Sequence, residues 1–466
     1  MQSGQLQRRL GLTSAITITV GAVIGSGIFL KPLSVAQNVP SELWIHLLWV
    51  GLGVVCLFGA FAYAELGAMF PEAGGQYAFL REGWGRLVGF LYGWTFFWVI
   101  NAGTVAALAI AFADNLLPLC GVDMAAERAE PRLRILVGSG MILFLAIVNH
   151  FGVRFGALLQ NVSTFAKLGA IGLIVVGGVL VVGGQPADSA VVVVPGAATE
   201  LSLGGLAIAF TGIFWAYEGW YQMPFSAAEL KRPERNLPLG LILGMLVLIV
   251  TYSAINAVYL HVVPFEEMRA LHDKTEVPAT TITRIFSADA AHYLTLLIAI
   301  SVMGAANPNL LSSPRAFYAM AQDGLVPHAL MRVHPRWGTP TASIWVQALW
   351  AILIVVVPAV TPAGWGLRDF DDVTAFVVFA GFLFYGLTVA SVYRLRATRP
   401  EVERPYRCTG YPVTPVLFIL VSVAFVVALL WDPGERQNAL IGLGILASGV
   451  PYYAWCTRRR AVGGSR

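Results

Sequence analysis

Charged residues are scarce in this chain: only 12% of its 466 residues are Asp, Glu, Lys or Arg, while 57% are hydrophobic. Soluble domains carry roughly twice that share of charge. The mean hydropathy of +0.71 agrees with this shortage. The composition therefore excludes a soluble protein and predicts an all-α polytopic membrane protein that lies in a lipid bilayer.

Motifs of enzymes and metal sites are missing as well. The cysteines Cys56, Cys120, Cys408 and Cys456 are scattered without a CxxC pair, so the sequence indicates neither a zinc site nor a disulfide framework. It contains no HExxH or GxSxG motif, and its seven histidines fall mostly in expected loops. We therefore expect no catalytic site, no metal and no cofactor. No expected loop is long enough to form the soluble output domain of a receptor.

The sequence does contain twelve apolar runs, each close to the roughly 20 residues that cross the hydrocarbon core of a bilayer. We therefore expect one transmembrane domain, residues 1–466, with twelve helices. The runs are Leu12–Asn38, Leu43–Phe70, Leu87–Pro118, Ile135–Asn149, Phe155–Val182, Leu203–Ala228, Leu237–His261, Ala290–Met320, Ala342–Val360, Val373–Tyr393, Val413–Trp431 and Leu440–Trp455.

An even number of spans puts both termini on one side of the membrane, and the basic residues indicate which side. Twenty of the thirty Lys and Arg residues fall on the side of the termini, nine on the opposite side, and Lys167 within a span. Cytoplasmic loops carry the excess of basic residues. Both termini are therefore expected in the cytoplasm. The net charge of +4 follows from the same rule, so we expect no nucleic-acid partner.

The first span is interrupted near its middle. In VGAVIGSGIFLKP, residues 20–32, an apolar helix meets Gly25, Ser26 and Gly27 and then resumes. Unwinding a helix exposes backbone NH and C=O groups, which a bilayer tolerates only where a ligand, water or protein satisfies them. Small residues also allow tight helix packing. This stretch alone therefore fits either a break or a close helix contact.

The sixth span contains a matching stretch, which favours a break in both. In IAFTGIFWAYEGWYQMP, residues 208–224, an ionisable Glu218 lies between Gly212 and Gly219. The first and sixth spans begin two blocks of five helices that cross the membrane in opposite directions. Interruptions at corresponding positions are typical of inverted-repeat transporters, which bind substrate where the broken helices meet. We expect a first repeat at 12–182, a second at 203–393 and two additional helices at 413–455.

An amino acid zwitterion would satisfy both interruptions. Its carboxylate would accept hydrogen bonds from the NH groups of Gly25, Ser26 and Gly27, at the positive N-terminal end of the outer half-helix. Its ammonium would donate to carbonyls where the first halves of the two broken helices end, at Val23 and Trp215. The two interruptions are therefore compatible with an amino acid zwitterion as substrate.

Five motifs in chain order resemble the amino acid–polyamine–organocation superfamily, and within it the L-type amino acid transporter-like permeases. They are VGAVIGSGIF (20–29), FAYAELGAMFPEAGGQYAFLREGWG (61–85), FWAYEGW (214–220), ELKRPERNLP (229–238) and FLFYGLTVASVYRLR (382–396). The resemblance covers most of the chain. It implies a leucine-transporter-like fold of five plus five inverted helices with two more at the end, and sodium-independent exchange or uptake of amino acids.

Carried over residue by residue, the resemblance places carboxylate binding on Ser26 and Gly27. It places amine binding on the carbonyls of Val23, Trp215 and Glu218, and an aromatic lid on the Trp215 side chain. The lid is often Phe in animal relatives, and the position of Glu218 is often Gly there. The side-chain selectivity of those relatives therefore does not carry over.

Lys167 is the one basic residue deep within a span, about 20 Å along its helix from Arg154 at 1.5 Å per residue. An intramembrane cation is costly and is functional by default. The resemblance places it where sodium-coupled relatives hold a sodium ion, between the first helix's break and the eighth span. The stretch Gly304–Ser312, with Asn307, would supply polar partners. The alternative is a lysine that reaches a water-filled crevice without a role.

Glu218 and Asn101 allow two interpretations each. Glu218 either carries a proton or contacts a polar substrate, or it caps the resumed half-helix at its positive end, which we favour slightly. Asn101, in the third span, either lines the substrate pocket or bonds a neighbouring helix.

These residues predict an amino acid permease that works by alternating access and exchanges neutral L-amino acids in a plasma membrane, here a bacterial inner membrane. A proton-coupled symporter is the main alternative, and a membrane-embedded enzyme is a third. Cys120 falls in the outer loop after the third span, close to where animal relatives pair covalently with a glycoprotein subunit. Many bacterial relatives work without that partner, so we expect a bystander thiol and no partner subunit.

Overall fold

The computed structural model describes residues 6–122, 130–181, 201–287, 289–360, 370–431 and 436–463. Within these ranges the chain is helical, and its one β pairing is an isolated bridge between Leu10 and Leu230. The predicted all-α fold is therefore confirmed.

Each of the twelve predicted runs coincides with a helical span, and most ends agree to within a few residues. Ten spans contain helices long and apolar enough to cross a membrane, and the other two contain shorter apolar helices. The spans are α1 (Leu12–Val23) with α2 (Gly27–Leu30) and α3 (Pro32–Gln37), α4 (Glu42–Met69), α6 (Arg86–Thr95) with the π-helix η1 (Phe96–Ile100) and α7 (Asn101–Leu116), α8 (Glu130–His150), α9 (Val153–Val181), α10 (Leu203–Tyr217) with the 3-10 helix η3 (Met223–Glu229), α11 (Pro233–Val262), α14 (Ala290–Leu311) with α15 (Pro314–Gln322), α16 (Thr341–Val360), α17 (Phe370–Thr398), α18 (Val413–Trp431) and α19 (Arg436–Gly463).

Short helices outside the spans were not predicted. They are α5 (Gln76–Trp84), η2 (Pro118–Cys120), α12 (Phe265–Ala270), α13 (Glu276–Ile285) and η4 (His328–Met331). Each is shorter than a bilayer crossing requires. They form connections between the spans.

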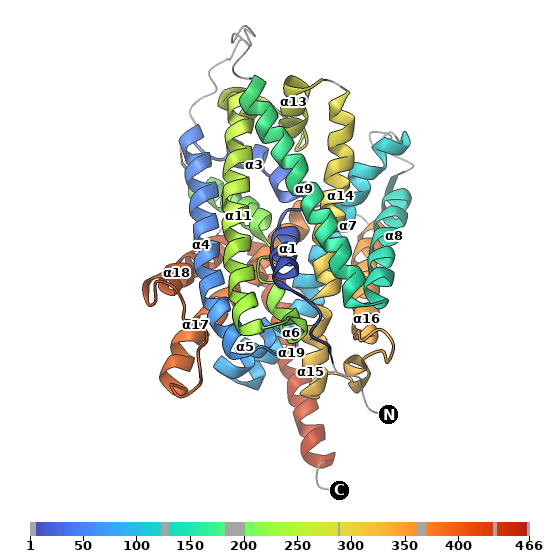
Figure 1. The fold of residues 1–466 in the computed structure, drawn as a ribbon, viewed down its shortest axis with the longest axis vertical. Coiled ribbons are helices and arrows are strands. Elements are labelled where there is room, and N and C mark those ends of the chain that lie inside the picture. Colours follow the sequence, from blue (N-terminus) through green and yellow to red (C-terminus); the bar gives the residue numbers. More distant parts are fainter. Residues whose placement is uncertain are drawn as a thin grey trace.

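Most of the spans run lengthwise through the molecule, and the start of α1 and the end of α19 lie toward the same end of it, which we call the terminal side (Figure 1). Large apolar side chains are exposed on outward faces, among them Leu173 and Val176 of α9 and Leu420 and Val423 of α18. Extended exposed apolar surface of this kind marks contact with a membrane. The chain is therefore a multi-pass membrane protein.

The helix α1 lies in the interior of the bundle, packed against α9, α11 and α14 (Figure 1). Glycines permit the close approach: a Cβ added to Gly240 of α11 would lie 2.6 Å from Ala15 Cβ, and one at Gly244 would lie 2.7 Å from Thr19 Cγ2. The residues of α1 from position 17 to 23 are all buried. Polar groups on this part of α1 must therefore find partners within the protein.

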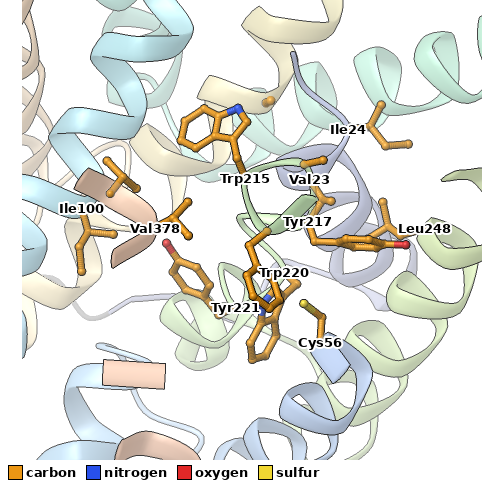
Figure 2. Packing of buried hydrophobic residues seen from close by; sticks show 14 of the residues in the cluster. Val23, Ile24, Cys56, Ile100, Trp215, Tyr217, Trp220, Tyr221, Leu248 and Val378 are labelled. Atoms are coloured by element: carbon orange, nitrogen blue, oxygen red, sulfur yellow. The ribbon is translucent and has the colours of Figure 1, made fainter. Parts of the chain in front are cut away.

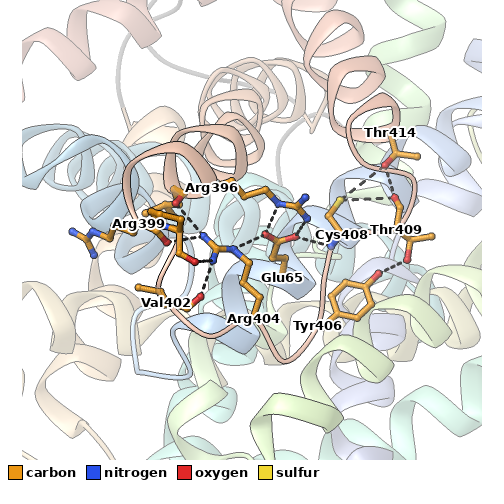
Figure 3. A network of polar contacts seen from close by, with 11 residues as sticks. Glu65, Arg396, Arg399, Val402, Arg404, Tyr406, Cys408, Thr409 and Thr414 are labelled. Atoms are coloured by element: carbon orange, nitrogen blue, oxygen red, sulfur yellow. Dashed lines mark hydrogen bonds and ion pairs between the residues drawn. The ribbon is translucent and has the colours of Figure 1, made fainter.

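A buried carboxylate fixes the loop between α17 and α18 to α4 (Figure 3). Glu65 of α4 accepts hydrogen bonds from Arg396 Nε and Nη2 at 3.0 and 2.6 Å, and from the backbone N of Cys408 at 2.6 Å. Arg404 Nε lies 3.5 Å from the same carboxylate. Separating these partners would leave the buried Glu65 carboxylate uncompensated, which is costly.

Candidate substrate site

The interruption predicted in the first span is present. α1 ends at Val23, Ile24 leaves the helical region with a ψ of 90°, and α2 begins at Gly27. Among the backbone hydrogen bonds of the described residues, none is donated by the NH groups of Gly25, Ser26 or Gly27. Free NH groups at the start of the second half-helix, α2, offer a place for an anion.

The interruption in the sixth span is also present. α10 ends at Tyr217, and the chain continues after a turn as the 3-10 helix η3. Within the turn Gly219 has a φ of +104°, and an added Cβ would lie only 3.0 Å from the carbonyl oxygen of Ala22. Both observations require glycine at this position, because any other residue would be strained and would press on α1.

The two interruptions meet beside one small cavity of about 20 Å³. A Cβ added to Gly27 would lie 2.4 Å from Ala216 Cα, so α2 and α10 are in direct backbone contact there. The cavity is lined by the predicted residues Val23, Gly25, Ser26, Gly27, Trp215 and Glu218, and also by Ala22, Thr104, Leu108, Gly219, Tyr221, Gln222, Ala305 and Asn309.

The Trp215 side chain lies over the interruption in α1. Its indole Nε1 donates a hydrogen bond of 3.3 Å to Ser26 Oγ. Figure 2 shows the indole pointing away from Trp220 and Tyr221, which follow it in the sixth span. The ring therefore lies beside the interruption and lines the same cavity.

Glu218 is held by two phenols and not by a helix end. The hydroxyls of Tyr221 and Tyr385 donate to the same carboxylate oxygen, at 2.7 and 2.6 Å. The 3-10 helix η3 has no side-chain cap. The capping role that we favoured is therefore wrong. A proton-carrying role and contact with a polar substrate stay open, because the side chain lines the cavity.

Sequence reasoning missed Tyr252 of α11. Its hydroxyl lies 3.1 Å from the carbonyl oxygen of Val23 and 2.9 Å from that of Ala216. It therefore bridges the ends of α1 and α10, the two helices that stop at the cavity. A tyrosine within an apolar run is too ordinary to predict such a role, and the pairing depends on two helices far apart in the sequence.

Lys167 lies directly behind the interruption in α1. It is fully buried, and its Nζ donates hydrogen bonds to the carbonyl oxygens of Gly21 at 3.0 Å and Ile24 at 2.6 Å. Ser301 of α14 donates to the same Ile24 oxygen at 3.2 Å. A Cβ added to Gly304 would lie 2.8 Å from Lys167 Cε, so this glycine makes room for the lysine.

Asn307 lies in a different network from the one expected. It accepts a hydrogen bond from Asn149 at 2.9 Å, and donates to the carbonyl oxygen of Gly156 at 3.0 Å and to Gln160 Oε1 at 2.9 Å. None of its hydrogen bonds reaches Lys167. Ser301, two turns earlier on α14, takes the place at the break that we expected residues 304–312 to fill.

Neither interpretation of Asn101 is seen in the structure. The residue is buried at the start of α7, just after the π-helix η1, but it is not among the residues that line the cavity. Its amide nitrogen and oxygen both lack a hydrogen-bond partner among the described residues. Thr104, one turn further along α7, lines the cavity instead.

Two amide side chains close one end of the cavity. Gln222 Nε2 donates to Asn309 Oδ1 at 2.8 Å, and Ser313 donates to Gln222 Oε1 at 3.0 Å. Gln347 of α16 donates to the Asn309 carbonyl oxygen at 2.6 Å. These bonds join the segment after α10 to α14 and α16. Substrate that passes between these segments must break them.

A family model described as amino acid permease matches residues 10–450. This chain belongs to that family. The permease is 31% identical over 448 residues to "b(0,+)-type amino acid transporter 1" of Homo sapiens, covering 96% of this chain and 88% of the relative. It is 28% identical over 450 residues to "Cystine/glutamate transporter" of Homo sapiens, with 96% and 85% covered. It is 30% identical over 455 residues to "Large neutral amino acids transporter small subunit 2" of Rattus norvegicus, with 96% and 80% covered.

The recognised family is thereby confirmed, and the permease is an amino acid transporter and not an enzyme. The name of the rat relative describes a subunit, which runs against our expectation that this permease has no partner subunit. In the structure Cys120 is exposed with a free thiol, at the end of η2.

Proposed function

We propose that this permease exchanges neutral L-amino acids by alternating access, without sodium. The observation that carries the proposal is the cavity that the interruptions of α1 and α10 share. A substrate carboxylate finds the free NH groups of Gly25, Ser26 and Gly27 there. Its ammonium finds the carbonyls of Val23 and Trp215. Each carbonyl already accepts one hydrogen bond in the protein, but a carbonyl oxygen has two lone pairs and can accept a second.

Sodium independence is supported by Lys167. Where a helix breaks, carbonyl oxygens point toward a common region and favour a cation. In this permease the ammonium of Lys167 donates to the carbonyl oxygens of Gly21 and Ile24, so the protein supplies its own cation to the break. A lysine bound to the protein cannot be transported, so it stabilises the break without coupling transport to a sodium gradient.

We also propose that the permease consists of two inverted repeats, residues 12–182 and 203–393, followed by two additional helices at 413–455. α4 packs along α11, α7 along α14 and α8 along α16. These are the second, third and fourth spans of each block of five. A pseudo-two-fold axis in the membrane plane brings corresponding helices together in this way. Residue 182 lies outside the described residues.

Proton-coupled symport is the second candidate, and Glu218 is the observation that favours it. A carboxylate that lines the cavity, with both bonded phenols on one oxygen, can accept a proton during the transport cycle. Intramembrane carboxylates often form proton relays in transporters. Exchange and symport differ in whether an internal amino acid is needed.

The experiment that tests the proposal is uptake of a labelled neutral amino acid into liposomes that contain the purified chain alone. Exchange predicts uptake only when unlabelled amino acid is inside the liposomes, whatever pH gradient is imposed across the membrane. Uptake into empty liposomes that follows an imposed proton gradient would instead establish symport. No uptake from the chain alone, with uptake restored by a co-expressed partner, would show that a partner subunit is needed.

Both termini are proposed to lie in the cytoplasm of a bacterium, with the permease in its inner membrane. The excess of basic residues on the terminal side supports this orientation. An impermeant thiol reagent added outside cells should label a single cysteine placed at Asp273, between α12 and α13, but not one placed at Arg407, an exposed residue between α17 and α18. Labelling of Arg407→Cys alone would reverse the orientation.

Trp215→Ala should weaken amino acid binding and slow exchange, because the ring that covers the interruption is lost and water enters the cavity. We expect a loss in affinity of about tenfold, which corresponds to ~1.4 kcal/mol. The matched control is Trp431→Ala, since that tryptophan of α18 is 79% exposed on an outward face. Unchanged affinity in Trp215→Ala would place the lid elsewhere.

A further inference from the structure

The half-helix α1 is fastened to α9 by a row of polar side chains, which we call the α9 ladder: Gln160, Asn161, Thr164 and Lys167. Spacings of three, four and seven residues place Gln160, Thr164 and Lys167 on one face of a helix. Gln160 Nε2 and Thr164 Oγ1 both donate to the carbonyl oxygen of Thr17, at 3.3 and 3.1 Å. The hydroxyl of Thr17 donates to Asn161 Oδ1.

The ladder lies unusually close to α1. A Cβ added to Gly21 would lie 2.0 Å from Gln160 Nε2 and 2.1 Å from Thr164 Oγ1. Gly21 thus leaves just the space that these polar atoms need. The ladder therefore meets the backbone of α1 directly, on the terminal side of the break that Lys167 holds.

Gln160 is itself oriented from behind by two buried asparagines. Asn149 of α8 donates to Asn307 Oδ1 at 2.9 Å, and Asn307 of α14 donates to Gln160 Oε1 at 2.9 Å. Because Gln160 Oε1 accepts from Asn307, its amide nitrogen must face α1. The three amides therefore form one directed chain of donors from α8 through α14 and α9 to Thr17. All three are buried, at 1% exposure or less.

We propose that Gln160, oriented by Asn307 and Asn149, is a positioning residue that holds α1 against α9 and so sets how readily the permease opens toward the terminal side. This inference rests on the proposed alternating access, in which α1 must move when that side opens. Gln160 does not line the substrate cavity. It acts through the carbonyl oxygen of Thr17, and thereby through the position of the half-helix that carries Val23.

The type of contact suits a connection that opens in every cycle. Neutral amide hydrogen bonds contribute little net free energy, because water replaces them when the groups separate. The Glu65 cluster, in contrast, holds a fully buried carboxylate that would be left unpaired by separation. An apolar seam between α1 and α9 would also resist opening, since water entering between the helices would contact apolar surface.

The test measures the labelling rate of a reporter cysteine placed at Ala22, a residue of α1 that lines the cavity. The background protein has Cys120 and Cys456 replaced by serine. An impermeant thiol reagent is added on the terminal side of oriented vesicles. Gln160→Met should raise the labelling rate about fivefold, the factor expected when one net hydrogen bond is lost. Asn307→Leu should act in the same direction, and the double variant should label no faster than Gln160→Met alone, because Asn307 acts through Gln160.

Two further variants keep the proposal falsifiable. Thr164→Val removes the other donor to the Thr17 carbonyl oxygen without changing the shape of the side chain. It should also raise the labelling rate, and it tests the proposal if Gln160→Met does not fold. Asn115→Leu is the matched control, since the one side-chain hydrogen bond of that buried amide among the described residues goes to the Ala111 carbonyl of its own helix. Three results would overturn the proposal. They are an unchanged labelling rate in the ladder variants, additive effects in the double variant, or an equal rise in labelling rate in Asn115→Leu. Labelling needs no transport, so failure of the proposed function would be seen separately, in the liposomes.

Discussion

Lys167→Ala is expected to reduce amino acid exchange about tenfold or more, an effect of at least ~1.4 kcal/mol on the transport step. The variant removes the donor that satisfies the carbonyl oxygens of Gly21 and Ile24 at the break. Ser301 still donates to Ile24, so the break is only partly unsatisfied and the variant should still fold. Wild-type exchange should be unchanged when sodium is replaced by choline.

Two matched variants separate charge from packing in this prediction. Lys167→Met keeps the length of the side chain but has no donor, so it should be impaired as much as Lys167→Ala. Lys231→Ala should leave exchange intact, because that lysine is exposed on the terminal side. A strict sodium requirement in the wild type, or full exchange by Lys167→Met, would mean that the lysine does not stand in for an ion.

Gly27→Ala is expected to abolish measurable amino acid binding. The added Cβ would lie 2.4 Å from Ala216 Cα and 3.1 Å from Ala216 N. These are backbone atoms, which cannot rotate away as a side chain can, so α2 must separate from α10. The NH groups that would hold the carboxylate then move away from the carbonyls that would hold the ammonium. Gly27→Val, with a larger side chain, should be at least as severe.

Calorimetric titration of the purified variant checks this result, with gel filtration to show that the protein is folded. Gly51→Ala is the control, because a Cβ added at that position of α4 meets nothing within 4 Å. Binding of wild-type strength by Gly27→Ala would mean that the contact between α2 and α10 is not part of the site.

The spans and both interruptions were predictable because they depend on local composition. Apolar runs of sufficient length predict helices in a bilayer, and the cluster Gly25, Ser26 and Gly27 marks the first interruption within one of them. The depth of Lys167 followed from counting residues along its helix. Each of these features depends on residues that are close together in the chain, so a single sequence is enough to predict it.

Properties that depend on pairing between distant segments could not be read in this way. Glu218 looked like a helix cap, but it is bonded by Tyr385, which is 167 positions away. The resemblance placed the stretch with Asn307 at the ion position, but in the structure Ser301 is the residue of α14 that donates to the Ile24 carbonyl oxygen at the break. Nothing in the sequence around Tyr252 predicts its role, because that role depends on the packing of α1 and α10 against α11.

Competition for binding of a labelled amino acid tests the central claim most directly, namely that the interruptions hold a zwitterion by its carboxylate and its ammonium. The competitors are the unlabelled amino acid, its amino alcohol, which lacks the carboxylate, and the matching carboxylic acid, which lacks the amine. The account predicts that the amino acid displaces the label and that each of the other two is weaker by about tenfold or more, since each loses charge-assisted hydrogen bonds. Displacement by the amino alcohol as strong as by the amino acid would contradict it.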